Sequence, residues 1–166
     1  INLGGEGKIE AADNINITAG TGGFNVKGGT INVAGQKTLA ITGNTTISGG
    51  TVTLSGGAAA ANVGTLTVNG NLSLNGEGAK IDLKEGASGG KLNVSGTTTA
   101  TAGNLSLGSG SVATFNGDAS FASGTLTAVN GAKIDMGSVT TANLERTLTV
   151  NSKDIKPLLG SAQAIK

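Results

Sequence analysis

Short segments of alternating apolar and polar residues, framed by glycine, run along most of the 166-residue chain. The segment 28–35 reads Gly-Gly-Thr-Ile-Asn-Val-Ala-Gly, and the segment 49–56, 21 positions later, reads Gly-Gly-Thr-Val-Thr-Leu-Ser-Gly. Alternate residues of an extended strand share a face, so Ile31 and Val33 are expected to point inward. One strand cannot bury such a pair alone, and recurrence near 20 residues is typical of solenoids, which stack successive copies.

Three interleaved series of apolar pairs predict three short strands in each coil of about 20–22 residues. The first series comprises Ile31/Val33, Val52/Leu54, Leu72/Leu74, Leu92/Val94, Val112 with Thr114, and Ile134/Met136. The second comprises Phe24/Val26, Thr45/Ile47, Leu66/Val68, Leu105/Leu107, Leu126/Ala128 and Leu148/Val150. The third, looser series comprises Leu39/Ile41, the region of Ala59 and Ala61, Ile81/Leu83, the region of Thr98 and Ala100, and Ala119/Phe121.

These series predict an all-β fold, a parallel β-helix (β-solenoid) of roughly seven coils. Ile31, Val52, Leu72 and Leu92 are expected to lie in one internal ladder. Asn-Gly between alternating segments also occurs in antiparallel hairpins, but hairpins do not require a steady recurrence. The segment 78–83 recurs at 131–136 as Gly-Ala-Lys-Ile-Asp followed by Met, yet the two copies fall in different series. Either a turn changes length in the second half or the register slips there.

Composition narrows the classes of function. The net charge is +1, with 11 basic and 10 acidic residues, which provides no field for nucleic acid or membrane binding. No apolar run approaches the ~18 residues of a membrane-spanning helix. We expect solenoid coils at 1–151 and a C-terminal cap, or the start of a following domain, at 152–166, where Pro157 interrupts the pattern. Because Ile1 opens the chain within strand-like sequence, we expect a piece of a longer or processed protein.

Three stretches resemble known surface proteins. Residues 12–20, Ala-Asp-Asn-Ile-Asn-Ile-Thr-Ala-Gly, resemble repeats of filamentous-haemagglutinin-like exported proteins. Residues 38–44 and 124–127 are similar to strands of autotransporter passenger domains. The resemblance implies a right-handed parallel β-helix at the extracellular surface of a Gram-negative bacterium, acting as adhesin, stalk or fibre. It carries over no catalytic residues.

The chain offers few residues that could support catalysis. The chain has no histidine and no cysteine, which excludes Ser/His and Cys/His nucleophile systems and the usual zinc sites within it. Asp82 and Glu85 form the nearest carboxylate pair, but Lys80 and Lys84 flank them, so we expect a solvated strand edge. We therefore predict no enzyme activity and no catalytic, cofactor or metal site.

Outward threonines suggest a separate hypothesis. Thr-x-Thr segments occur at 51–53, 65–67, 125–127 and 147–149. A flat array of such pairs over adjacent coils would suit ice binding, whereas isolated pairs reflect the strand propensity of threonine. The latter interpretation is favoured.

The favoured function is a structural or adhesive segment of an exported bacterial surface protein, with a host or neighbouring-cell surface, copies of itself or adjoining coils as partners. The alternatives are a self-assembling surface-layer or filament subunit and a carbohydrate-active enzyme. The ends are expected to differ. The Ile1 end should be an open strand edge, whereas Lys153, Asp154, Lys156 and Pro157 should discourage strand addition at the other end.

Overall fold

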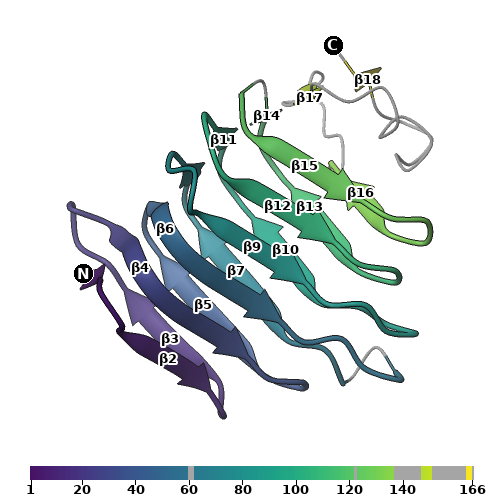
Figure 1. The fold of residues 1–166 in the computed structure, drawn as a ribbon, viewed down its shortest axis with the longest axis horizontal. Coiled ribbons are helices and arrows are strands. Elements are labelled where there is room, and N and C mark those ends of the chain that lie inside the picture. The colour runs from purple at the N-terminus through teal and green to yellow at the C-terminus, as the bar shows by residue number, and fades with distance from the viewer. Residues whose placement is uncertain (60–61, 122, 137–146, 151–163, 166) are drawn as a thin grey trace.

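The computed structural model describes residues 1–59, 62–121, 123–136, 147–150 and 164–165. Every described element is a β-strand, and the strands wind as successive coils along one axis (Figure 1). Each coil has three faces, and strands of one face pair in parallel with those of the coils before and after. Among the described residues, no helix is long and apolar enough to cross a membrane.

Strands of the first face are β1 (Asn2–Leu3), β8 (Leu72–Leu74), β11 (Thr98–Ala100), β14 (Ala119–Phe121), β17 (Thr147–Val150) and β18 (Ala164–Ile165). Those of the second face are β2 (Lys8–Ala11), β9 (Lys80–Leu83), β12 (Asn104–Leu107) and β15 (Thr125–Ala128). Two long strands, β4 (Phe24–Val33) and β6 (Thr45–Leu54), serve both of these faces. The third face holds β3 (Ile15–Thr18), β5 (Thr38–Thr42), β7 (Thr65–Asn69), β10 (Lys91–Val94), β13 (Val112–Phe115) and β16 (Lys133–Asp135).

The long strands bend at glycine pairs. The register between β4 and β6 shifts around Lys27, and Gly29 and Gly50 have φ of 78° and 79°. A Cβ on Gly29 would lie 2.1 Å from the backbone oxygen of Gly7 in the coil before. The Gly-Gly pair thus turns the chain between faces where successive backbones touch. The sequence predicted separate short strands here, whereas the chain remains in strand pairing through this corner.

The core is a set of stacked aliphatic and aromatic ladders between the three faces. Inward side chains of the second to sixth coils are almost all buried, among them Ile31, Val52, Ile81 and Leu105 on the second face. Outward positions between them carry mostly Thr, Asn, Ser and Lys. The predicted all-β parallel β-solenoid is confirmed, with a third face of six strands.

The predicted internal ladder is wrong beyond Val52. Ile31 pairs with Val52 as expected, but Val52 pairs with Ile81, whereas Leu72 pairs with Thr45 on the first face. Leu92 pairs with Leu66 on the third face. The reason is coil length: Phe24 and its partner Thr45 are 21 positions apart, while Thr45 and Leu72 are 27 apart.

An enlarged corner between the second and third faces accounts for most of the change. In the second coil, residues 34–37 join these faces, whereas in the third coil the connection runs from residue 55 to residue 64, of which residues 60–61, including Ala61 of the predicted strand, lie outside the described residues. The region of Ala59, predicted as a weak strand, belongs to this connection. The two Gly-Ala-Lys-Ile-Asp copies do lie on different faces, with Ile81 on the second and Ile134 on the third. The strand register therefore departs from the predicted series in the third coil, earlier in the chain than the sequence suggested.

The domain boundary expected at residues 151/152 lies outside the described residues, as do Lys153, Asp154, Lys156 and Pro157. Beyond that boundary only Ala164–Ile165 is described, and it pairs in parallel with β17.

Candidate functional site

Asp82 is the carboxylate that the sequence placed closest to another acid. It lies on β9, points outward, and pairs with the Lys84 ammonium at 2.5 Å and the Lys80 ammonium at 3.9 Å. Glu85 follows in the exposed turn after β9. The Asp82 carboxylate is therefore engaged by two flanking ammonium groups and does not face a second carboxylate. The prediction was a solvated strand edge, whereas β9 lies between β6 and β12 and the Asp82 side chain is only 17% exposed.

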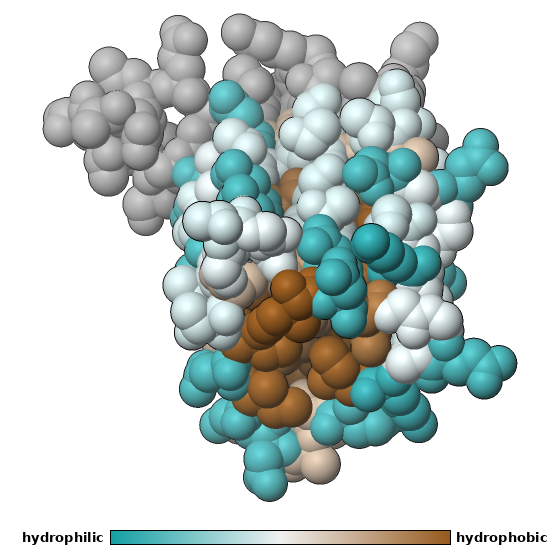
Figure 2. Space-filling view, turned by 90° about the vertical axis from the view of Figure 1, so that its left-hand side faces the viewer, coloured by the Kyte–Doolittle hydropathy of each residue, from teal (hydrophilic) through white to brown (hydrophobic). Residues whose placement is uncertain are grey.

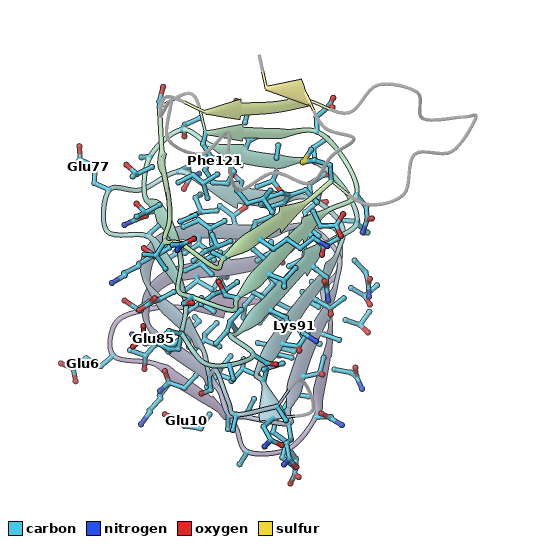
Figure 3. The ribbon with its side chains drawn as sticks, turned by 90° about the vertical axis from the view of Figure 1, so that its right-hand side faces the viewer. Glu6, Glu10, Glu77, Glu85, Lys91 and Phe121 are labelled. Carbon is cyan, nitrogen blue, oxygen red and sulfur yellow. The ribbon has the colours of Figure 1, made fainter. Side chains whose placement is uncertain are left out.

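The remaining carboxylates do not converge in the described part of the chain. Glu6 and Glu10 belong to the first coil, and Glu77 and Glu85 to two turns of the fourth. Figure 3 shows Glu6 and Glu77 directed away from the body of the solenoid. No group of three or more Asp and Glu residues among the described positions could hold a metal ion.

A Lys-Ile-acid triplet recurs on three strands. Lys8-Ile9-Glu10 lies on β2, Lys80-Ile81-Asp82 on β9 and Lys133-Ile134-Asp135 on β16. In each triplet the lysine and the acid lie on the outer face and pair with each other, at 2.6, 3.9 and 3.4 Å. The central isoleucine faces inward because its position alternates with theirs.

Glu10, the acid of the first triplet, also contacts the following coil. Hydrogen bonds from Lys8 and, in the next coil, from the amide nitrogen of Asn32 lower the pKa of the Glu10 carboxyl below its ordinary value. The Lys8 and Asn32 nitrogens lie 2.6 and 2.8 Å from the same oxygen, Oε1. Glu10 is thus held as an anion at the edge of the first coil.

The Thr-x-Thr pairs do not form one array. Thr51 and Thr53 lie on the second face of the third coil, and Thr65 and Thr67 on the third face of that coil. Along the second face, Thr53 is followed by Asp82, then Ser106, and only then Thr127. The strand 147–150 pairs with β14 on the first face. The described arrangement therefore lacks the continuous flat threonine surface that the ice-binding hypothesis required.

A projecting corner interrupts the regular sides of the solenoid. The connections 55–64 and 84–90 lie in adjacent coils at this corner (Figure 1). They are joined through Gly57 and Ser88, whose backbone groups exchange hydrogen bonds of 2.8 and 3.0 Å in an antiparallel bridge. A Cβ on Gly86 would lie 2.7 Å from Gly57 backbone atoms, so glycine permits this close approach. The sequence assigned the region of Ala59 to a strand of the third, looser series, and missed the corner.

A shallow groove of about 360 Å³ lies at the opposite corner, between the first and second faces. It presents one carboxylate, three hydroxyl groups and one amide, from Glu77, Thr101, Ser123, Thr125 and Asn104. The three phenylalanines, Phe24, Phe115 and Phe121, are all buried, so none offers a ring surface to a ligand there. The groove has polar partners for a small hydroxylated ligand, but no paired acids for hydrolysis.

The inward apolar residues of the described chain are most exposed at the N-terminal end of the solenoid. Figure 2 looks at this end and shows a cluster of hydrophobic residues surrounded by hydrophilic ones. Leu3, Ile9, Ile15 and Ile17 of the first coil are only half-buried, and Ile1 is 57% exposed. The sequence predicted an open strand edge at Ile1; on that side Leu3, Ile9, Ile15 and Ile17 are partly exposed, whereas Ala11 of the same coil is buried.

Comparisons of the chain with known protein families, with curated proteins and with solved structures found no match. The geometry of the solenoid and its surface is therefore the basis for a functional proposal.

Proposed function

We propose that this chain is a structural or adhesive segment of an exported bacterial surface protein, in which it forms a rigid solenoid rod. The resemblance of residues 12–20, 38–44 and 124–127 to filamentous-haemagglutinin-like and autotransporter passenger repeats supports this assignment. The proposed location is outside the cell, and the proposed partners are a host or neighbouring-cell surface, or adjoining coils.

The observation that carries the proposal is the unbroken stack of three parallel faces. Each backbone pairs along the axis with the coil before and the coil after, from β3 through to β16 on the third face. Bending or stretching such a rod requires many backbone hydrogen bonds and buried ladder contacts to be broken together. A stiff element with short polar side chains on its sides suits a spacer that holds a recognition surface away from the cell.

Force spectroscopy on the full chain, tethered at both ends, tests the structural role. A rod is expected to resist extension until coils unfold at defined forces. A smooth, featureless extension like that of a flexible linker would contradict the structural role.

The adhesive role is tested with chain-coated beads on bacterial and epithelial cells. The control is the chain with Val52→Asp, which changes a single residue and disrupts the ladder. Binding by the native chain and its loss in the control are expected. Equal binding by both would show nonspecific adsorption, and absence of binding would contradict adhesion while leaving the structural role standing.

The second candidate, a self-assembling surface-layer or filament subunit, is favoured by the open N-terminal end. Exposed strand edges and apolar surface at the end of a rod favour end-to-end contacts. Filaments in negative-stain images at raised concentration would support this candidate over a simple rod.

A further inference from the structure

The corner between the first and second faces changes shape in the fourth coil. In the second and third coils the chain stays in strand pairing through this corner, within β4 and β6. In the fourth coil, residues 75–79 separate β8 from β9, and Glu77 is exposed there. In the fifth and sixth coils the same two faces are separated only by residues 101–103 and 122–124. The fourth-coil connection therefore projects beyond those that follow it, as Figure 3 shows at Glu77.

Small residues form the floor of the groove beside this projection, which has a volume of about 360 Å³. Ala102 and Gly103 belong to the fifth coil, between Glu77 of the fourth coil and Ser123 of the sixth. Gly103 has a φ of 79°, and a Cβ on it would lie 2.8 Å from the backbone oxygen of Ala79. Backbones two coils apart are separated by about 10 Å, because neighbouring strands lie ~4.8 Å apart. This spacing leaves room for one pyranose ring above the floor.

The groove offers both donors and acceptors of hydrogen bonds. Three exposed hydroxyl groups border the floor, those of Thr101, Ser123 and Thr125. The Asn104 side-chain oxygen accepts a hydrogen bond from the Ser106 hydroxyl at 3.4 Å, which leaves the amide nitrogen as a donor. Glu77 at the rim adds a carboxylate acceptor, and none of the described residues that line the groove is basic. A neutral ligand with several hydroxyl groups suits this set, whereas an anion would meet Glu77 without a compensating cation.

We propose that this groove binds one ring of a neutral saccharide. Neighbouring hydroxyl groups of a sugar both donate and accept, so they can pair with the Glu77 carboxylate, the Asn104 amide and the groove hydroxyls together. The volume of about 360 Å³ lies at the lower end of the range for ligand pockets, which suits a single ring. The lining contains one acid and no second, so the sugar is held and not hydrolysed. The inference deepens the proposed adhesive role and rests on it, because it names the class of ligand that the segment would hold.

Titration of the full 166-residue chain with the methyl glycosides of glucose, galactose and mannose tests the inference. Amide resonances of the isotope-labelled protein are followed by NMR. At least one glycoside is expected to shift the amides of residues 101–104, with a Kd of about 1 mM. The uronic acid of the same sugar carries a carboxylate and is expected to bind at least about fivefold more weakly, because like charges meet at Glu77.

Two variants, each with a matched control, place the sugar in the groove. Glu77→Gln removes the carboxylate at the rim, and its control, Glu85→Gln, changes an exposed acid in the other turn of the fourth coil. Asn104→Ala removes the amide, and its control, Asn93→Ala, changes an outward, half-buried asparagine on β10 of the third face. Glu77→Gln and Asn104→Ala are each expected to weaken binding at least about fivefold, and the controls are expected to leave it unchanged. Circular dichroism establishes that each variant remains folded.

Three results would overturn the inference. All three glycosides could fail to bind at their solubility limits, or the shifted amides could lie away from the groove. Alternatively, each folded variant could bind as its control does. The bead assay separates this inference from the adhesive role. Beads that adhere to cells while no glycoside binds would leave adhesion standing without this groove, whereas glycoside binding without bead adhesion would leave the groove standing without the adhesive role.

Discussion

Glycine determines how closely successive coils approach at the residue scale. Many glycines in the turns have no room for a methyl group, because the backbone of the neighbouring coil occupies the position that a Cβ would take. The turn 75–79 contains one glycine with no room for a Cβ and one glycine with open space around it. A Cβ on Gly76 would lie 1.7 Å from the backbone oxygen of Ser48, while one on Gly78 would meet nothing within 4 Å. Neither glycine has a positive φ, so the difference is one of space alone.

Gly76→Ala is therefore expected to destabilise the fold by about 3 kcal/mol, because the added methyl group must push apart two stacked coils. Gly78→Ala, two residues away in the same turn, is expected to change the free energy of unfolding by less than about 0.5 kcal/mol. Urea denaturation followed by circular dichroism measures both. Similar losses for the two variants would show that this corner is not packed as described.

Two buried hydroxyl groups are a second feature at this scale. Thr45 and Thr98 are 2% and 1% exposed, and their Oγ1 atoms have no hydrogen-bond partner among the described residues. Both occupy inward positions of the first face, where neighbouring coils place Leu72 and Ala119. A buried hydroxyl without a partner costs free energy, and valine has nearly the same shape.

Thr98→Val is expected to raise the free energy of unfolding by about 1 kcal/mol. The control, Thr99→Val, changes the adjacent residue, whose side chain is exposed. Thermal denaturation of both variants beside the native chain measures the effect. A lower melting temperature for Thr98→Val than for Thr99→Val would indicate that the hydroxyl group has a stabilising partner.

At the scale of elements, the sequence predicts strands well and register poorly. Inward pairs such as Ile31/Val33 and Val52/Leu54 were recognisable, because alternation within a strand is a local property. Register depends on the length of the connections between strands. The enlarged corner at 55–64 has the same Ser, Gly and Ala residues as the regular turns, so the sequence does not reveal its extra length. A constant period therefore assigned the strands after this corner to the wrong faces.

A different signal in the sequence would have given the register. Where the third face meets the first, a glycine precedes a residue with a short polar side chain in four coils: Gly43-Asn44, Gly70-Asn71, Gly96-Thr97 and Gly117-Asp118. These positions stack. The Asn44 side-chain oxygen accepts a hydrogen bond from the Asn71 backbone N–H at 3.1 Å, and the Asn71 oxygen accepts one from Thr97 at 2.9 Å. This corner follows the true coil lengths, because it immediately precedes each strand of the first face.

Some features of the candidate surfaces could likewise be predicted from the sequence, and others could not. The ion-paired state of Asp82 was predictable, because Lys80 and Lys84 are its neighbours in sequence. The bridge between Gly57 and Ser88 was not, because it joins two connections from different coils. The open strand edge at Ile1 was predicted from the sequence, but the grouping of Leu3, Ile9 and Ile15 at one end required their placement on three faces of one coil.

The inward and outward positions of a strand are expected to respond differently to charge. Val52→Asp places an ionised group in the aliphatic ladder between Ile31 and Ile81 and is expected to cost at least about 3 kcal/mol, or prevent folding. Thr46→Asp, on the outer face of the same strand β6, is expected to cost less than about 1 kcal/mol. Denaturant titration of both variants provides the comparison, and equal losses would contradict the assignment of faces.

The whole molecule is a rod whose sides and N-terminal end have different chemistry. The sides present Thr, Asn, Ser and locally paired charges, as in the triplets at Lys8, Lys80 and Lys133. Such surfaces resist lateral association, because outward charges and short polar groups offer little apolar area. The described N-terminal end presents isoleucine and leucine with unpaired strand edges. Contacts along the axis are therefore favoured over contacts between sides, as a spacer or an end-to-end assembly requires.

The central claim is that the chain is a parallel β-solenoid whose coils lengthen at the third turn, so that Thr46 pairs with Ser73 on the first face. Disulfide crosslinking tests it directly, because the chain contains no native cysteine. A disulfide requires Cα atoms within about 7 Å, which adjacent strands at ~4.8 Å satisfy. Thr46→Cys with Ser73→Cys should crosslink readily under mild oxidation. Thr53→Cys with Ser73→Cys, the neighbours expected from a constant period of 20 residues, should not. Efficient crosslinking of the second pair, with failure of the first, would contradict the coil register and the ladders built on it.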